Sequence, residues 1–189
     1  MLDTFLADYL KAAATVTADL PRERIAEAVR HLAAARDDGH TVFVAGNGGS
    51  ATVASNLVVD LVKCGSFGKS KRFRAVNLAD SVATTTAFAN DEGYDTVFAE
   101  PLRNFAAAGD VLVVISGSGN SPNVLRAVDV ARELGCTVIA MTSGEQGQLR
   151  GLADVPLLVP SRHMGRLEDA FFVLSHTLAY PFIEDVPGL

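Results

Sequence analysis

The spacing of apolar residues divides the chain into a helical N-terminal part and a longer part that alternates between strands and helices. From Leu2 to about Thr17, apolar side chains recur every three or four positions, and the same spacing returns from Pro21 to Asp38. Beyond residue 40, short apolar runs alternate with segments of helical spacing. This order predicts two amphipathic helices followed by an α/β domain.

Five short segments are predicted as parallel strands, at residues 42–44, 72–78, 111–115, 137–141 and 155–159. Helical segments are predicted between and after them, at 51–64, 81–90, part of 96–107, 122–134, a short stretch at 146–152, and 165–182. Because strands separated by helices pair in parallel, the prediction is a three-layer α/β sandwich. We expect a single domain, with N-terminal helices over 1–38 and an α/β core over 39–189.

The N-terminal helices have no obvious place on such a sheet, because the α/β core is complete without them. We therefore expect part of the segment 1–38 to pack against a second copy of the chain. The alternative is that these helices cover the sheet of their own chain.

The segment TVFVAGNGGS, residues 41–50, ends an apolar run in a glycine-rich turn that leads into a helix. Gly46, Gly48 and Gly49 permit positive φ and a close approach of the backbone to a ligand. The helix after the turn offers free N–H groups and the positive end of its dipole, which favours an anion. The alternative is a plain turn between a strand and a helix.

The segment VLVVISGSGNS, residues 111–121, repeats this arrangement, with Pro122 in the first turn of the next helix. The hydroxyl groups of Ser116, Ser118 and Ser121 can donate hydrogen bonds to phosphate oxygens. In an open parallel sheet, loops of this kind meet in the crevice where the strand order reverses. Neither loop contains a lysine, which argues against a nucleotide-binding P-loop and favours a small phosphate ester.

Composition narrows the class of protein further. A chain of 189 residues, 49% hydrophobic and 20% charged, is large enough for one well-packed core. The net charge of -6 and the absence of Trp argue against a nucleic-acid partner. No segment approaches the ~20 apolar residues of a membrane span, and acids and Lys11 interrupt the N-terminal segment, so we expect a cytoplasmic protein without a membrane partner. Cys64 and Cys136 are isolated and are expected to be reduced thiols.

Four segments occur in a characteristic order: the GNGGS loop, the NDEGYDTVFA turn, the GDVLVVISGSGNSPNVLRAVDVARELG block and the VPSRHMGRLE segment. Together they resemble the sugar isomerase (SIS) domain family, and specifically its phosphoheptose isomerase branch, over residues Met1 to Ile183. The resemblance implies a five-stranded parallel sheet of the flavodoxin type and assembly as a homotetramer or a dimer. It also implies a role in carbohydrate metabolism, as an aldose–ketose isomerase that converts sedoheptulose 7-phosphate to a heptose 7-phosphate through a cis-enediolate.

The resemblance extends to individual site residues. It implies a set of substrate-binding residues, which are Asn47, Gly48, Gly49, Ser50, Asp91, Ser116, Ser118, Asn120, Ser121 and Glu168. In phosphoheptose isomerases a Glu on the helix after the first loop is the base and a His on the last helix is the acid, and Asp60 and His176 stand at these positions here. Both groups are needed, because a proton leaves the carbon next to the carbonyl while the oxygen gains negative charge.

The sequence departs from the family at the metal site. The family holds zinc with a His and that Glu four residues apart, a Gln, and the last His, whereas this chain has Asn56, Asp60, Glu168 and His176. Asn is a poor zinc ligand, which leaves Asp60, Glu168 and His176 as candidates for zinc or for a hard cation such as Mg²⁺. Glu168 and His176 are about 12 Å apart along a straight helix at a rise of ~1.5 Å per residue. One ion therefore joins them only if the helix bends or if different subunits supply them; otherwise they serve different parts of a site.

Three functions stay open on these residues. The chain is an isomerase that works without zinc or with a hard cation, an isomerase of another phosphorylated sugar, or a non-catalytic SIS protein that binds sugar phosphates or other proteins. The last of these is similar to the protein that associates with the bacterial replication initiator. For His176 taken alone, the alternative is a core histidine bonded to a backbone group.

Overall fold

A computed structural model describes the whole chain, residues 1–189, and its centre is a five-stranded parallel sheet. The strands are β1 (Thr41–Gly46), β2 (Arg74–Asn77), β3 (Val111–Ser116), β4 (Thr137–Ser143) and β5 (Val155–Val159). They lie in the order β2-β1-β3-β4-β5, and every neighbouring pair is parallel. The strand order reverses between β1 and β3, which confirms the predicted flavodoxin-type sheet and its crevice.

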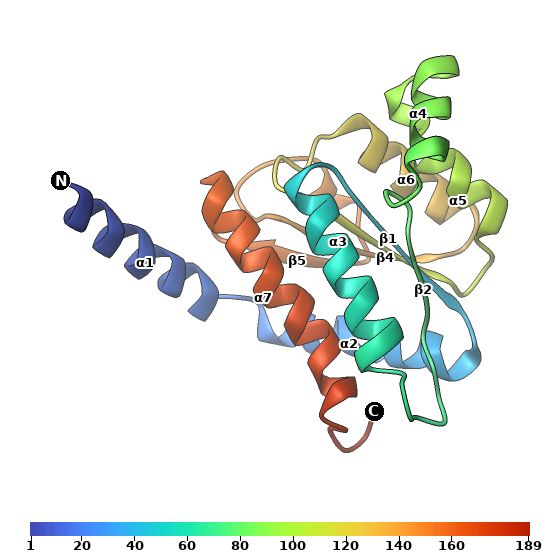
Figure 1. Cartoon of the computed structure of the whole chain (residues 1–189), viewed down its shortest axis with the longest axis horizontal. Helices are drawn as coiled ribbons and strands as arrows, with labels where there is room; N and C mark the ends of the chain where they lie inside the picture. The colour runs from blue at the N-terminus through green and yellow to red at the C-terminus, as the bar shows by residue number, and fades with distance from the viewer.

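Helices precede, connect and follow these strands (Figure 1). The α-helices are α1 (Leu2–Ala18), α2 (Arg22–Asp38), α3 (Gly49–Val59), α4 (Val82–Asp91), α5 (Ala99–Phe105), α6 (Pro122–Glu133) and α7 (Met164–Ile183). Shorter turns of helix are η1 (Asp60–Cys64), η2 (Tyr94–Thr96) and η3 (Leu149–Gly151). None of these helices has both the length and the apolar character needed to cross a membrane.

The sheet carries a hydrophobic core on each face, which confirms the three-layer prediction. Along β1, Val42 and Val44 belong to the core beneath α2, α3 and α7, whereas Phe43 and Ala45 belong to the core beneath α5 and α6. The two faces alternate because successive strand residues point to opposite sides of a sheet. From Val42 to Gly46, β1 is buried on both sides, and these positions show no polar alternation.

The helix after the first loop differs from its prediction as a single helix over 51–64. α3 ends at Val59, and η1 is a π-helical turn in which the backbone N–H of Gly65 donates to the carbonyl of Asp60 at 2.7 Å. A π turn holds more residues per turn than an α-helix, so the side chains that follow it are rotated about the helix axis. Such turns are rare in proteins as a whole, but many of those that occur lie at functional sites.

α1 projects from the body of the protein, and apart from Val16 near its C-terminal end it covers none of its own sheet (Figure 1). Only Val16 of this helix is buried, and the hydroxyl of Tyr9 anchors it by donating to Asp169 of α7 at 2.8 Å. That hydrogen bond is the main cause that raises the pKa of Tyr9. For α1 the alternative of covering its own sheet is therefore wrong, whereas α2 does pack beneath the sheet.

Candidate functional site

A cavity of about 270 Å³ opens where β1 and β3 end, at the point where the strand order reverses. Both predicted phosphate loops contribute to it. It is lined by Asn47, Ser50, Ile115, Ser116, Gly117, Ser118, Ser121, Met164 and Glu168. The structure therefore confirms that the two loops converge, although they are more than 60 residues apart in the sequence.

The serine hydroxyls of the second loop form one polar cluster at this cavity. The Oγ atom of Ser116 lies 3.2 Å from the Oγ of Ser121 and 3.5 Å from the Oγ of Ser118. Ser121 is the N-cap residue of α6, yet its side chain makes no capping hydrogen bond. Its hydroxyl is turned to the cluster instead, so a ligand there meets hydroxyl groups together with the positive ends of α3 and α6.

The amide of Asn47 is held in place by two residues that sequence reasoning did not single out. Its Nδ2 donates to Oδ1 of Asn123 at 2.9 Å, and Nδ2 of Asn123 donates to Oδ1 of Asn47 at 2.8 Å. The hydroxyl of Tyr94 also donates to Oδ1 of Asn47, at 3.0 Å. Tyr94 lies in the NDEGYDTVFA motif and Asn123 in the GNSPN motif. Their place in these motifs was the only signal for them in the sequence. These bonds fix Asn47 at the edge of the cavity.

Glu168 places a carboxylate in the same cavity. Its side chain packs against the backbone of Gly49, at the first residue of α3, where a Cβ atom would collide with the carboxyl group. Gly48 and Gly49 are both exposed, so the cavity is open to solvent on this side. The predicted residues Gly48, Gly49, Ser50 and Glu168 are thus brought together at the N-terminus of α3.

Two other predicted binding residues lie away from this cavity. Asp91 is exposed at the end of α4, where it accepts a hydrogen bond from its neighbour Asn90. Asn120 is exposed, and its Oδ1 accepts from the backbone N–H of Gln148 at 3.1 Å. Neither residue lines the cavity within one chain.

The predicted acid and base form a second cluster, on the facing sides of α3–η1 and α7. Oδ2 of Asp60 lies 3.8 Å from Nε2 of His176. The Asp60 side chain is 14% exposed and the His176 side chain 49% exposed, so this histidine is not a core residue. Asn56 joins the cluster by donating from Nδ2 to Oδ2 of Asp60 and to Oγ of Ser175, each at 3.2 Å.

The two clusters are separate within one chain. α3 and α7 run side by side in the same direction, with Glu168 beside Gly49 and Ser175 beside Asn56 (Figure 1). Ser50 and Asp60 are ten residues apart on this helix, which corresponds to about 15 Å at ~1.5 Å per residue. The serine-lined cavity and the pair formed by Asp60 and His176 therefore lie at different levels along the same two helices.

The residues present do not fit the zinc ion that the family resemblance implies. No group of three or more His, Cys, Asp or Glu side chains converges within the chain, because Glu168 lies at the other cluster from Asp60 and His176. The fourth position is Asn56, whose Nδ2 points to the carboxylate as a hydrogen-bond donor. A zinc ion needs lone pairs from about four ligands, and an amide N–H group supplies none.

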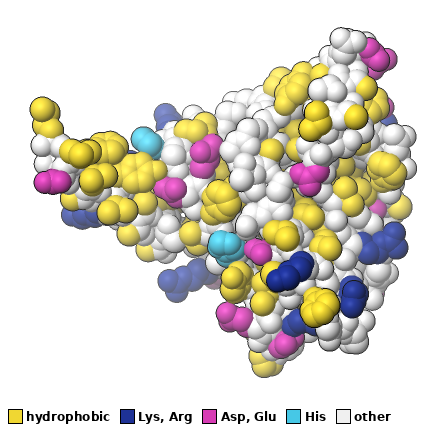
Figure 2. Space-filling model, viewed as in Figure 1, with side chains coloured by type: hydrophobic (Ala, Val, Ile, Leu, Met, Phe, Trp, Pro, Cys, Tyr) yellow, Lys and Arg dark blue, Asp and Glu magenta, His cyan; other side chains and the backbone are white.

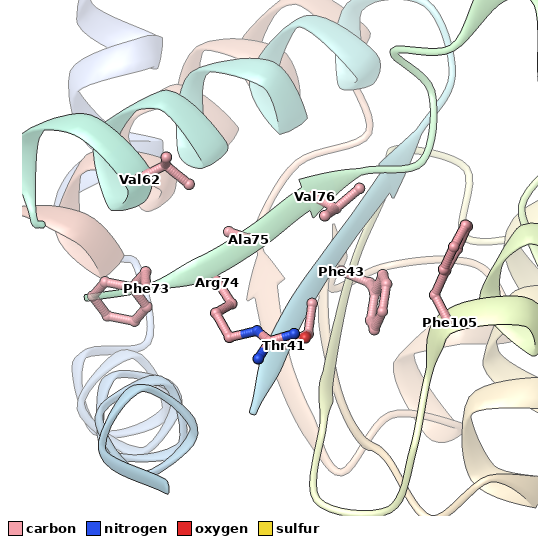
Figure 3. Close-up of a pocket in the computed structure, with 8 residues that line it drawn as sticks. All are labelled: Thr41, Phe43, Val62, Phe73, Arg74, Ala75, Val76 and Phe105. Atoms are coloured by element: carbon pink, nitrogen blue, oxygen red, sulfur yellow. The ribbon is translucent and has the colours of Figure 1, made fainter. Parts of the chain in front are cut away.

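A larger cavity of about 410 Å³ lies at the β2 edge of the sheet and contains none of the predicted site residues. Figure 3 shows the side chain of Arg74 between Phe73 and Phe43, with its guanidinium beside Thr41. The remaining lining is apolar, from Val62, Ala75, Val76 and Phe105. It has no cluster of hydroxyl groups, so it does not suit a phosphate ester.

Comparisons with known proteins agree with this geometry. Residues 5–143 match the model of the SIS domain family. The chain is 39% identical to a phosphoheptose isomerase of Citrifermentans bemidjiense over 155 residues, which cover 82% of this chain and 80% of the relative. It is 45% identical to a phosphoheptose isomerase of Mycobacterium tuberculosis over 141 residues, covering 75% of this chain and 71% of the relative. The solved structure of phosphoheptose isomerase GmhA from Neisseria gonorrhoeae superposes with a TM-score of 0.90 at 29% identity, covering 98% of this chain and 100% of that chain.

Proposed function

The chain belongs to the SIS domain family and, within it, to the phosphoheptose isomerases, and on this basis we propose that it interconverts sedoheptulose 7-phosphate and the corresponding heptose 7-phosphate. The observation that carries the proposal is the serine-lined cavity between β1 and β3. Four hydroxyl groups and the N-termini of two helices meet there, and no lysine or arginine lines it. This is the environment that a phosphate ester held by hydroxyl groups and helix dipoles requires.

Asp60 and His176 are the acid–base pair of this proposal. Asp60 removes the proton from C1 of the ketose, and the electron pair of that C–H bond forms the C1=C2 double bond of the enediol. His176 donates a proton to O2 as the C2=O2 double bond opens. A proton is then added at C2 while O1 loses its own proton and becomes the carbonyl oxygen. The number of protons and electrons is conserved, so no oxidant or reductant is needed.

The distance between the two clusters along α3 bears on how one sugar could meet both of them. An extended seven-carbon phosphate spans about 10 Å, given covalent bonds of about 1.5 Å, and the separation along α3 is larger than this. We therefore propose that one chain holds the phosphate while a neighbouring copy supplies Asp60 and His176. Assembly into a homotetramer, or at least a dimer, is then part of the function.

The exposed face of α1 supports this assembly. Leu2, Phe5, Leu6 and Leu10 are between 47% and 69% exposed, and Figure 2 shows hydrophobic side chains along the projecting arm. A monomer gains nothing from such an exposed apolar face, whereas a second copy of the chain would bury it. We place the protein in the cytoplasm and in carbohydrate metabolism, as an enzyme acting on a small phosphorylated metabolite.

Proton NMR of sedoheptulose 7-phosphate with the purified protein in D₂O tests the reaction. We expect deuterium to replace hydrogen at C1 of the ketose, with aldose signals growing at the same time. The Asp60→Asn variant is expected to bind the sugar and to leave C1 unexchanged. Binding of the sugar to the unaltered protein without any exchange would contradict the isomerase and favour a non-catalytic SIS protein.

Mixed assemblies test the composite site. Asp60→Asn and Ser118→Asp chains are each expected to be inactive, the first without its base and the second with a negative charge in the phosphate cavity. After the two variants are unfolded together and refolded, sites that combine an intact cavity with an intact Asp60 should restore exchange. Failure of the refolded mixture to regain activity, with mixed oligomers confirmed by native mass spectrometry, would show that each chain uses its own two clusters.

A further inference from the structure

The hydrogen bonds of Asn56 define its role at the acid–base pair. Its Nδ2 atom lies 3.2 Å from Oδ2 of Asp60, the same oxygen that faces Nε2 of His176 at 3.8 Å. The same Nδ2 lies 3.2 Å from Oγ of Ser175, which is fully buried. Asn56 thus ties the carboxylate of η1 to a buried hydroxyl of α7, and both helices that carry the pair are joined through it.

The neighbouring carboxylate determines which way the amide of Asn56 points. Only the NH₂ end of the amide can donate to Asp60, because the carbonyl end and an ionised carboxylate are both acceptors. A flipped amide would set two oxygen atoms against each other, and it would be stable only if a cation lay between them. In the observed orientation the NH₂ group donates to a lone pair of Asp60, which is then not free to bind a metal. The hydrogen atoms of this group also carry partial positive charge, which repels a cation.

We propose that Asn56 is a positioning residue that takes the place of a metal ligand, holding Asp60 toward His176, and that the isomerisation catalysed by this chain proceeds without bound zinc. This inference rests on the proposed isomerase function. Two features support it: the N–H donor that faces Asp60, and the anchoring of the amide on buried Ser175. The charge of the enediolate is then met by the proton from His176 alone.

Zinc binding provides a readout that is independent of activity. Competition with a chromophoric chelator should detect no stoichiometric zinc on the unaltered protein at a free zinc concentration of about 1 µM. The matched variant Asn56→His returns an imidazole beside Asp60 and His176, and it should bind zinc at least about tenfold more tightly. One zinc ion per unaltered chain with a Kd below about 1 µM, or no tightening in the variant, would overturn the proposal.

Turnover kinetics test the positioning role. Asn56→Ala frees the Asp60 side chain, and a displacement of about 1 Å at a reacting group can lower the rate about a hundredfold. We expect kcat to fall by about tenfold to a hundredfold with KM unchanged, because the phosphate cavity does not include Asn56. The control is Ser55→Ala on the same helix, which removes a hydroxyl that donates to Asp80 at 3.0 Å and leaves Asp60 untouched. A fall in thermal stability with an unchanged kcat in Asn56→Ala would reduce Asn56 to a structural residue and contradict the proposal.

The effect of chelation separates failure of this inference from failure of the proposed function. We expect the rate of deuterium exchange in the unaltered protein to be the same with chelator as with added Zn²⁺. Exchange that stops with chelator and returns with Zn²⁺ would overturn the metal-free reaction while leaving the isomerase established. The absence of exchange under both conditions would instead contradict the isomerase function itself.

Discussion

Glu168 brings a negative charge into a cavity that otherwise suits an anion. Its carboxyl group lies against Gly49 at the positive end of α3, where the helix dipole favours a negative charge. A phosphate ester would compete for the same end of the helix and would be repelled by the carboxylate. We therefore expect this residue to limit how tightly the cavity holds a phosphate.

The variant Glu168→Gln removes this charge and keeps the shape and the hydrogen-bonding capacity of the side chain. We expect the Kd for a sugar phosphate to fall roughly five- to tenfold, because two unit charges a few ångströms apart near a protein surface repel by about 1 kcal/mol or more. Isothermal titration calorimetry at low salt measures the change. Weaker binding in the variant would mean that the carboxylate accepts a hydrogen bond from the sugar that outweighs the repulsion.

The two cysteines are expected to differ in reactivity. Burial raises the pKa of the Cys136 thiol to about 11, and its Sγ donates weakly to the carbonyl of Ala107 at 3.6 Å. Because the thiolate is the reactive form, Cys136 should stay unmodified by iodoacetamide at pH 8 while Cys64, which is only partly buried, is alkylated. Peptide mass spectrometry of the folded protein gives the answer, and urea-unfolded protein, labelled at both positions, is the control. Equal labelling of the two cysteines in the folded protein would contradict the burial of Cys136.

The segment after β4 packs against the second serine-rich loop. The structure of this segment differs from its prediction. The expected short helix over 146–152 is only the single turn η3, and the residues before it pack against the loop. The backbone N–H of Leu149 donates to the carbonyl of Gly119 at 3.0 Å. The backbone of this segment passes very close to the loop at Gly147, which has a φ of 88°. A Cβ atom at this position would lie 2.6 Å from Cα of Gly119.

Replacing Gly147 with Ala should therefore disturb both the fold and the phosphate loop. A positive φ costs a residue with a Cβ about 1–2 kcal/mol, and the collision is with backbone, which cannot move aside as a flexible side chain would. We expect the free energy of unfolding in urea to fall by about 2 kcal/mol or more, with weaker sugar-phosphate binding. The matched control is Gly151→Ala, where a Cβ atom would meet nothing within 4 Å. Equal stability of the two variants would contradict this bracing role.

At the scale of the whole molecule, we expect the exposed apolar face of α1 to contact a second copy of the chain. The variant Phe5→Asp places a charge on the exposed apolar face of α1, where Phe5 is 60% exposed. If that face is buried between copies, the unpaired charge is costly and the assembly should dissociate to a smaller species. Size-exclusion chromatography with light scattering measures the mass, and exchange at C1 of the sugar should fall with it.

The control for this variant is Val82→Asp on α4, at the other end of the molecule from α1 (Figure 1). Val82 is 73% exposed, so the same charge is added without disturbing α1. We expect its mass to equal that of the unaltered protein. An unchanged mass in Phe5→Asp would exclude α1 as the interface that holds the copies together.

Local pattern was sufficient to predict the architecture and the two loops that line the cavity. Strand β5 was predicted with its observed bounds, and most of the longer helices were placed within a few residues, because burial on a sheet or helix face imposes a period that a short window of sequence records. The serines of the second loop were found for a similar reason. In a turn between a buried strand and a helix, the glycines and hydroxyl groups that can contact a ligand follow one another in the sequence, so they can be identified without the structure.

Only the tertiary structure decided what depends on contacts between distant residues. The amide pair of Asn47 and Asn123 joins two loops, and the contact of Asp60 with His176 joins two helices that are more than 100 residues apart in the sequence. The π turn at Asp60 and the contact of the Asn56 amide with Ser175 of α7 are features that no local window of sequence records. The sequence by itself therefore determined the fold and the class of ligand, because these follow from local periodicity and local chemistry. The separation of the serine-lined cavity from the pair Asp60 and His176 was decided by the parallel packing of two helices, a relation that exists only in the folded chain.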